Sequence, residues 1–377
     1  MNEAFPFGDS WNLNLPETPS RSHLYCMSPV GIGTPYIESL TGYVARLAKL
    51  HHVNVGTLLA KEFVTLLRQP NNKSYLHGMN SRTKALNGTG AMATDLVQAL
   101  EKLTTQNNLR LLTMLAWAEV LPAKGLLRHN RAWCPMCYED CLAGKKSVYE
   151  PLLWSLEVVK ICPNHRQPLH SHCPHCKCQL PFLGWYSCPG YCSKCGEWFG
   201  QQLEYTTEEL GGLDWQLWVA ETVGDLLAKA PFLTSPPIRQ RVARTLTACI
   251  DQIADGNTAE FARQLGMPKN TVWLWMSGKV LPQLDALLKI CHCLNLSVSD
   301  FLAGNSISLE NNGTTRIFDS SAISNSRQSV NQAFDTPKIR ALLEDFFEDD
   351  AYTSWSMQRI AKHLNPNISQ SSKKRGR

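Results

Sequence analysis

Cys134-Pro-Met-Cys137 begins the stretch that decides the fold, because three further four-residue knuckles follow it along the chain. These knuckles are Cys162-Pro-Asn-His165, Cys173-Pro-His-Cys176 and Cys192-Ser-Lys-Cys195. A C-x-x-C turn places two sulfurs on one side of the backbone, close enough to share an ion at about 2.3 Å. A C-x-x-H turn supplies the remaining two corners of a tetrahedron in the same way. The four knuckles therefore predict two closed metal sites.

The order of the knuckles divides their ligands between two structural Zn²⁺ ions. The first predicted set is Cys134, Cys137, Cys162 and His165, and the second is Cys173, Cys176, Cys192 and Cys195. Gly196 follows the last knuckle, where the turn needs a positive φ. A closed four-ligand site is structural, since catalytic zinc keeps one position for water. Cys178 and Cys188 remain alternatives for a ligand of the second site.

The composition around this stretch is that of a folded protein of the cytoplasm. Of 377 residues, 44% are hydrophobic and 18% are charged, which excludes wholesale disorder. The net charge of +5 permits nucleic-acid binding without demonstrating it. No apolar run has the ~18–20 residues that span a membrane, and the N-terminus lacks the pattern of a secretory signal. In a reducing compartment the 14 cysteines are expected to be metal ligands and buried thiols rather than disulfides.

The chain before the knuckles is predicted to be helical. Residues 1–24 are polar and proline-rich and are expected to form a flexible arm, and residues 25–130 an N-terminal helical domain. Apolar residues recur at three- and four-residue steps over 36–67, and Thr34-Pro35 suits the start of that helix. A further helical pair is expected at about 92–104 and 108–118. Residues 131–200 then form the loop-rich tandem zinc-finger module.

Residues 205–302 are predicted to form a helical domain that contains a helix-turn-helix. Thr258 can cap a first helix whose inner face is Phe261, Ala262 and Leu265. Gly266 ends that helix, and a second helix follows from about Pro268 to Met276 with Val272 and Trp275 inward. The fold class is therefore mainly α, with a small zinc-ribbon or zinc-finger module before a C-terminal helix-turn-helix.

The second helix of this pair carries residue types that read DNA. The candidate DNA-contacting residues are Lys269, Asn270, Thr271, Trp273, Lys279 and Arg263. Asparagine can pair with adenine, lysine with guanine, and threonine can contact a thymine methyl. Between residues 239 and 280 there are six Arg or Lys against three Asp or Glu, a net charge of +3 that suits phosphate contacts. The alternative is a small helical bundle that contacts protein.

The end of the chain is divided between a linker and a last helical segment. Residues 303–335 are a polar linker, and residues 336–377 carry helical patterns at about 337–348 and 354–364. Ser354–Leu364 resembles the opening of a second DNA-binding unit, which leaves open whether the chain is cut short near Arg377.

Motifs of common enzymes are missing from the sequence. It has no G-x-x-x-x-G-K-[ST] phosphate loop, no nucleophile elbow and no H-E-x-x-H. The sequence is therefore predicted not to encode an enzyme.

Four features together resemble the TniQ/TnsD family of target-selection proteins from Tn-seven-type and CRISPR-associated transposons. The first is Glu38-Ser-Leu-Thr-Gly-Tyr43-Val-Ala-Arg46-Leu-Ala48, which is similar to the family's E-S-L-x-x-Y-x-x-R-L-A signature. The others are Arg131-Ala-Trp-Cys134 with its knuckle, Trp154 leading to the Cys162 knuckle, and the second cysteine quartet. The resemblance covers about 25–200.

The resemblance implies a DNA-binding adaptor for transposition. Family members recruit an AAA+ ATPase regulator and the transposase to the insertion site, with Glu38, Tyr43 and Arg46 in the region that faces the ATPase. The implied partners are double-stranded DNA and that ATPase, and the implied location is the nucleoid within the cytoplasm. One alternative is an adaptor that docks on a CRISPR RNA-guided effector complex. A second is a zinc-containing transcriptional repressor.

Overall fold

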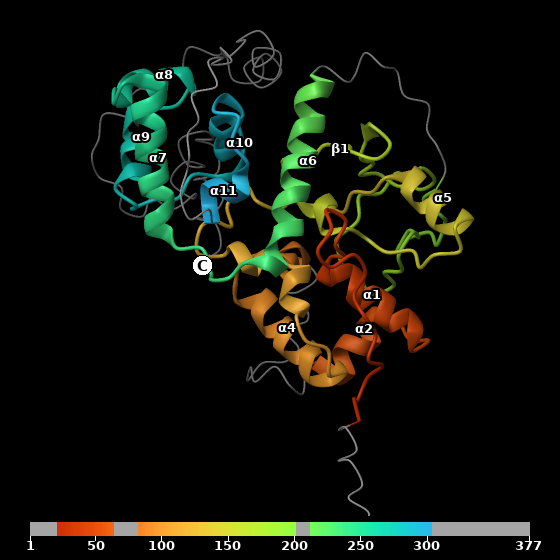
Figure 1. Cartoon of the computed structure of the whole chain (residues 1–377). Helices are drawn as coiled ribbons and strands as arrows, with labels where there is room; N and C mark the ends of the chain where they lie inside the picture. Colours follow the sequence, from red (N-terminus) through yellow and green to blue (C-terminus); the bar gives the residue numbers. More distant parts are fainter. Residues whose placement is uncertain (1–20, 64–81, 201–211, 304–377) are drawn as a thin grey trace, which may run out of the picture. The chain divides into compact units, whose positions relative to one another are not determined.

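The computed structural model of the chain describes residues 21–63, 82–200 and 212–303 (Figure 1). These residues are mainly helical and belong to one compact unit. The predicted mainly helical class is thereby confirmed, together with two groups of Cys and His side chains that could bind zinc. Three predicted segments lie almost wholly outside the described residues: the arm except its last residues, the linker except Ala303, and the C-terminal helical pair.

The N-terminal part is a set of short helices around a shared apolar core. Its elements are α1 (Leu40–Leu50), α2 (Val55–Leu58), the π-helical turn η1 (Leu59–Phe63), the 3-10 turn η2 (Thr83–Asn87), α4 (Ala91–Thr104), and the 3-10 turns η3 (Leu109–Leu112) and η4 (Met114–Trp117). The helix pair predicted at about 92–104 and 108–118 is thus one α-helix followed by two 3-10 turns.

Helix α1 begins later than the sequence predicted. Ser39 caps it, because the Ser39 Oγ accepts a hydrogen bond from the backbone N–H of Gly42 at 3.1 Å. The predicted start at Thr34-Pro35 is wrong. The Thr34 hydroxyl accepts from the N–H of Tyr36 at 3.2 Å, which closes a separate turn before the helix.

The metal module contains one helix, a 3-10 turn and a two-stranded ribbon. They are α5 (Pro135–Ala143), η5 (Leu152–Ser155), β1 (Ile161–Cys162) and β2 (Gln167–Pro168), with the strands antiparallel. The Trp133 ring stacks on that of Phe199 with their centroids 4.1 Å apart. Leu183, from the loop between the last two knuckles, is buried in the N-terminal core. The module is therefore packed against the N-terminal helices rather than held on a free loop.

The C-terminal part is a bundle of helices that follows α6 (Leu213–Lys229) and the 3-10 turn η7 (Ala230–Phe232). Its helices are α7 (Arg239–Ala254), α8 (Thr258–Gln264), α9 (Lys269–Met276), α10 (Leu284–Cys293) and α11 (Val298–Ala303). The side chains predicted to face inward on α8 and α9 are buried, namely Phe261, Ala262, Val272 and Trp275, and so is Leu265 at the C-cap of α8. Gly266 has φ +64°, as the turn between the helices requires.

One capping prediction for α8 is wrong. Asn257, not Thr258, is the N-cap, because its Oδ1 accepts from the N–H groups of Ala259 and Glu260 at 3.1 and 3.2 Å. Thr258 is already the first helical residue. A shift of one residue is possible because Asn and Thr both favour the cap position.

The helix α6 joins the bundle to the rest of the unit. It contacts β1 and η5, and a buried apolar cluster runs from Trp117 and Ile161 through Val223 on α6 to the later helices. Pro35 packs so closely on α6 that a Cβ at Gly224 would lie 2.8 Å from the Pro35 Cβ. This cluster crosses both residue 130 and residue 200, the predicted domain boundaries.

Candidate metal centres and candidate DNA-contacting helix

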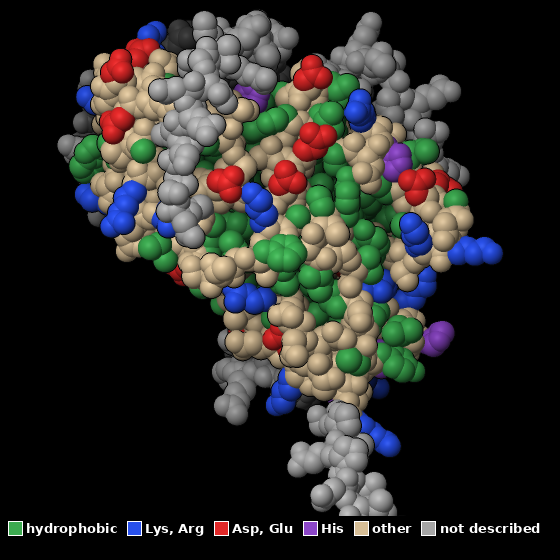
Figure 2. All heavy atoms as spheres, viewed as in Figure 1, with side chains coloured by type: hydrophobic (Ala, Val, Ile, Leu, Met, Phe, Trp, Pro, Cys, Tyr) green, Lys and Arg blue, Asp and Glu red, His purple; other side chains and the backbone are tan. Residues whose placement is uncertain are grey.

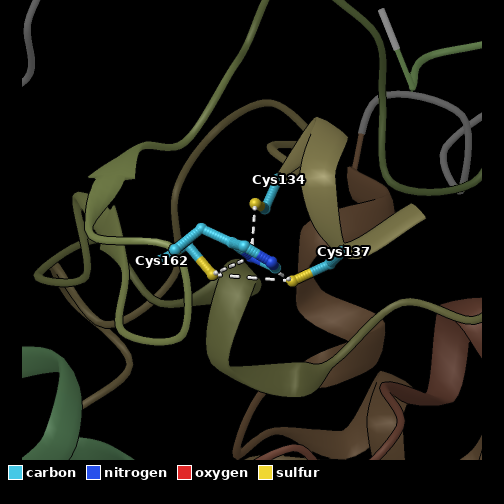
Figure 3. A group of neighbouring side chains, drawn as sticks. Cys134, Cys137 and Cys162 are labelled. Carbon is cyan, nitrogen blue, oxygen red and sulfur yellow. Dashed lines mark hydrogen bonds between the residues drawn. The ribbon is translucent and has the colours of Figure 1, made fainter. Parts of the chain in front are cut away.

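The first candidate metal centre is assembled by a helix start and a strand turn. Cys134 is the N-cap of α5, with Pro135 fixing the first turn, and Cys137 follows within the helix. Cys162 ends β1, and His165 lies in the turn to β2. Figure 3 shows the three cysteine side chains pointing toward one another.

The geometry of this group fits a single ion. The Sγ atoms of Cys137 and Cys162 are 3.5 Å apart, and the His165 Nδ1 lies 3.4, 3.3 and 3.6 Å from the sulfurs of Cys134, Cys137 and Cys162. A tetrahedral ion with metal–sulfur bonds of about 2.3 Å spaces its sulfurs about 3.8 Å apart, and its nitrogen slightly closer. Three thiolates and one imidazole in this arrangement are a donor set that zinc accepts.

The second candidate metal centre has four cysteines from the last two knuckles. The Sγ atoms of Cys173 and Cys195 are 3.6 Å apart, and those of Cys176 and Cys192 are 3.7 Å apart. These sulfurs lie within 4.8 Å of one another, and the group does not include Cys178 or Cys188. The backbone N–H of Cys178 instead donates to the Cys176 sulfur and lowers the pKa of that thiol to about 6.

Three of the knuckles close with the same turn. The residues after them, Arg166, Lys177 and Gly196, have φ of 49°, 57° and 80°. Each donates its backbone N–H to the carbonyl of the first cysteine in its knuckle, at 2.7, 2.9 and 2.9 Å. The positive φ predicted at Gly196 is confirmed, and two cationic residues adopt the same left-handed conformation without glycine's freedom.

The signature residues of the N-terminal part form an internal ion pair. Arg46 donates from Nε and Nη2 to the two carboxylate oxygens of Glu38, at 2.8 and 2.7 Å, and from Nη2 to the Ser28 carbonyl at 3.0 Å. Glu38 and Tyr43 are 0% exposed. Burial raises the pKa of Glu38, and the Arg46 guanidinium opposes that rise. The structure places Glu38 and Tyr43 inside the fold rather than on a surface that a partner can reach.

A second buried ion pair lies within the metal module, next to the start of α1. Arg131 Nη2 lies 2.5 Å from a carboxylate oxygen of Glu150, with 2% and 9% of the two side chains exposed. Arg131 also donates to the Tyr191 carbonyl and the Tyr138 hydroxyl at 3.1 and 3.2 Å. The Glu150 carbonyl accepts from the N–H of Ser39 at 2.8 Å, at the cap of α1. Glu150 thus contacts Arg131 through its side chain and the start of α1 through its backbone carbonyl.

The predicted DNA-contacting residues lie on the outer side of α9 and around it. Lys269 and Asn270 are exposed at its first turn, and Thr271 is half-buried. Trp273 is 53% exposed, and the Lys279 Nζ lies 4.9 Å from the centroid of its ring.

Arg263 stands apart from this group because it belongs to α8. Its guanidinium pairs with Glu260 three residues before it, at 2.7 Å. Lys and Arg side chains are scattered over the face in Figure 2 rather than gathered in one patch. Net charge alone therefore does not mark a DNA-binding face in that view.

Sequence reasoning did not assign two residues that contact ligands of the first metal centre, nor a third, Glu150, that pairs with Arg131. Asp140 Oδ2 lies 2.9 Å from the His165 Nε2, and Gln167 donates from Nε2 to the Cys134 sulfur at 3.2 Å. Glu150 holds Arg131 as described above. For Asp140 a signal existed, since it follows Cys137 by three residues on a helix and therefore shares its face.

Comparison with known proteins identifies one family. The model of the TniQ family matches residues 29–169, which run from before α1 through the first candidate metal centre. No curated protein matches the chain. Among the described residues, no helix has both the length and the apolar character needed to cross a membrane.

Proposed function

We propose that this chain, a TniQ family protein by its domain at residues 29–169, is a zinc-stabilised adaptor that binds DNA and directs transposition to a target site. The family supports a role in target selection for transposition. Two closed four-donor groups support zinc as a structural ion, because no position is kept for water or substrate. On this proposal the chain catalyses no step itself and acts by bringing other proteins to DNA.

The exposed first turn of α9 carries the proposal of direct DNA binding. Val272 and Trp275 anchor the inner side of this helix in the core, while Lys269, Asn270 and Trp273 are exposed. A helix held this way can present its first turn to the major groove, where amide and ammonium groups read base edges. The exposed cations Lys269 and Lys279 add phosphate contacts.

The proposal is tested by DNA binding of the purified chain without guide RNA or other proteins. Sequence-specific binding to sites protected on genomic DNA supports a selector that recognises its own target. Binding that is weak, salt-sensitive and indifferent to sequence favours instead the adaptor that a CRISPR effector complex delivers. If the chain binds DNA specifically but captures no AAA+ ATPase in a separate pull-down, the zinc-containing repressor is favoured instead.

Two substitutions, one in the first turn of α9 and one just after its end, are expected to have different effects on DNA binding. Asn270→Ala should cost about 1–3 kcal/mol at the preferred site and relax base preference at one position. Lys279→Ala should weaken all sequences alike and flatten the dependence of affinity on salt. Binding to the site and to scrambled DNA across a salt series measures both effects. Gln264→Ala, which removes an exposed amide from α8, is the control, and equal sequence-blind losses from all three would remove α9 as the reading helix.

Because Glu38 and Tyr43 are buried, we propose that the ATPase docks on exposed apolar side chains of the N-terminal part and the metal module. We call this surface the aromatic corner, and it consists of Tyr25, Leu50, Val53, Trp185 and Tyr186, which are 39–62% exposed. Two contacts hold it together. The ring of Tyr25 lies 4.3 Å from that of His51 beside Leu50, and the N–H of Gly56 in α2 donates to the Trp185 carbonyl at 3.1 Å.

Removing an exposed ring from the aromatic corner should weaken capture of the ATPase. Tyr186→Ala is expected to reduce the affinity by about 1–2 kcal/mol, as loss of an aromatic anchor does, without affecting stability. Phe232→Ala is the matched control, because Phe232 is 73% exposed but packs beside Gly33 instead. Pull-down with the purified ATPase measures the difference. If both Tyr186→Ala and a combined Tyr186→Ala/Leu50→Ser variant still capture the ATPase in full, the ATPase docks on another surface.

A further inference from the structure

The imidazole of His165 has different surroundings on its two nitrogens. Its Nδ1 faces the sulfurs of Cys134, Cys137 and Cys162 at 3.3–3.6 Å. Its Nε2 points the other way and lies 2.9 Å from the Asp140 Oδ2. A carboxylate can only accept, so the Nε2 must carry the proton of this hydrogen bond. In the neutral imidazole, which is the form that binds a metal, the lone pair is then on Nδ1, the nitrogen that faces the sulfurs.

We propose that Asp140 is a positioning residue of the first metal centre, which orients His165 and fixes the tautomer that can bind the ion through Nδ1. Helix α5 makes this arrangement possible, since Cys137 and Asp140 are three residues apart on one face. A single helix thus supplies one ligand and orients another that comes from the turn after β1.

The second metal centre provides an internal reference in the same chain. Its sulfurs receive backbone N–H groups, such as those of Lys194 and Cys195 on Cys192 at 3.4 and 3.5 Å. Among the described residues, no carboxylate forms a hydrogen bond with one of the four cysteines of that centre. A substitution at Asp140 should therefore change the rate at which the first centre releases its ion and leave release from the second centre unchanged.

The size of the effect follows from exposure. Loss of such an outer partner typically lowers metal affinity by about 10–100-fold. The Asp140 side chain is 66% exposed, so water competes for both groups and the lower end of this range applies. We expect Asp140→Ala to speed release of one Zn²⁺ by about 10-fold. Asp140→Asn keeps an acceptor oxygen but loses the charge, and its release rate should fall between those of Asp140→Ala and the natural chain.

The experiment is transfer of Zn²⁺ from the full chain to an excess of a chromophoric chelator. This inference rests on the proposed zinc occupancy, which the natural chain tests first by its metal content. With Asp140→Ala, the expected trace has one accelerated phase and one unchanged phase, each of one ion. Glu139→Gln is the control, because Glu139 accepts from the Trp198 Nε1 at 2.7 Å and touches no ligand.

Two outcomes overturn the positioning role of Asp140. The first outcome is a natural chain that holds two ions and an Asp140→Ala chain that releases both at unchanged rates. In that case the proposed zinc sites are supported, but Asp140 does not position His165. If both phases accelerate equally, or Glu139→Gln acts like Asp140→Ala, the effect is a general loosening of the module. Proton NMR of the His165 Nε2–H in the zinc-loaded chain adds a readout that general loosening does not reproduce, since Asp140→Ala should remove the acceptor of that proton and speed its exchange with water while the second centre stays unchanged.

Discussion

Replacing Cys134 by serine is expected to lower the zinc content from two ions per chain to one and to unfold the part of the metal module around the first centre. The Cys134 side chain is completely buried, and its Sγ lies 3.4 Å from the Nδ1 of His165, one of the three other ligands. Binding of structural zinc contributes about 10–16 kcal/mol of apparent folding free energy in small zinc modules, which is as large as the stability of a typical domain. Metal analysis and limited proteolysis measure the two effects, and Cys173→Ser should give the same result at the second centre.

Cysteines outside the two centres supply the control for this prediction. Cys178 and Cys188 lie within the same module but in neither four-donor group. Cys178→Ser and Cys188→Ser should therefore keep two ions and the folded module. A Cys134→Ser chain that retains both ions, or a natural chain that is metal-free yet fully folded, would contradict the proposed zinc centres.

Replacing Arg131 by methionine should cost about 3–5 kcal/mol of unfolding free energy, the second-largest effect that we expect. The substitution leaves Glu150 with no cation beside it, and both side chains are at most 9% exposed. Burial already raises the pKa of Glu150, which Arg131 opposes, so the lone carboxylate would be costly to keep charged. Chemical denaturation followed by fluorescence, at a fixed saturating Zn²⁺ concentration, measures the loss.

The double variant Arg131→Met/Glu150→Leu separates the lone charge from lost packing. Replacing both partners of a buried ion pair by apolar residues is often close to neutral. The double variant should therefore be more stable than Arg131→Met, although Tyr138 and the Tyr191 carbonyl still lose a donor. A loss below about 1 kcal/mol in Arg131→Met would show that the pair behaves like an exposed one.

The ligands of the metal centres could be predicted from sequence because their geometry is local. In a knuckle such as Cys173-Pro-His-Cys176, both donors come from one turn, so spacing alone brings them together. The helices of the C-terminal bundle could be predicted for a similar reason, since the buried Phe261 and Trp275 recur at helical steps. Each of these inferences needed only neighbours within a few residues.

The roles of charged residues could not be predicted, because they depend on distant parts of the chain. The resemblance implied that Glu38 lies in a region that faces a partner, yet its carboxylate is buried and accepts from the N–H of Val30 and from Arg46. Glu150 had no motif, and its partner lies 19 residues earlier in the sequence. The helix start was misplaced because Thr34 and Ser39 both suit a cap, and only packing decides between them.

The stacking of Phe199 on Trp133 and the burial of Leu183 have a practical meaning for anyone who wishes to express the family domain alone. A fragment of residues 29–169 would lack Phe199 and Leu183, so the apolar surfaces that they cover would be exposed to solvent. Such a fragment should precipitate or be degraded, whereas one that extends past Gly200 keeps these contacts. The smallest unit that folds on its own is therefore expected to be longer than residues 29–169, which the family model matches.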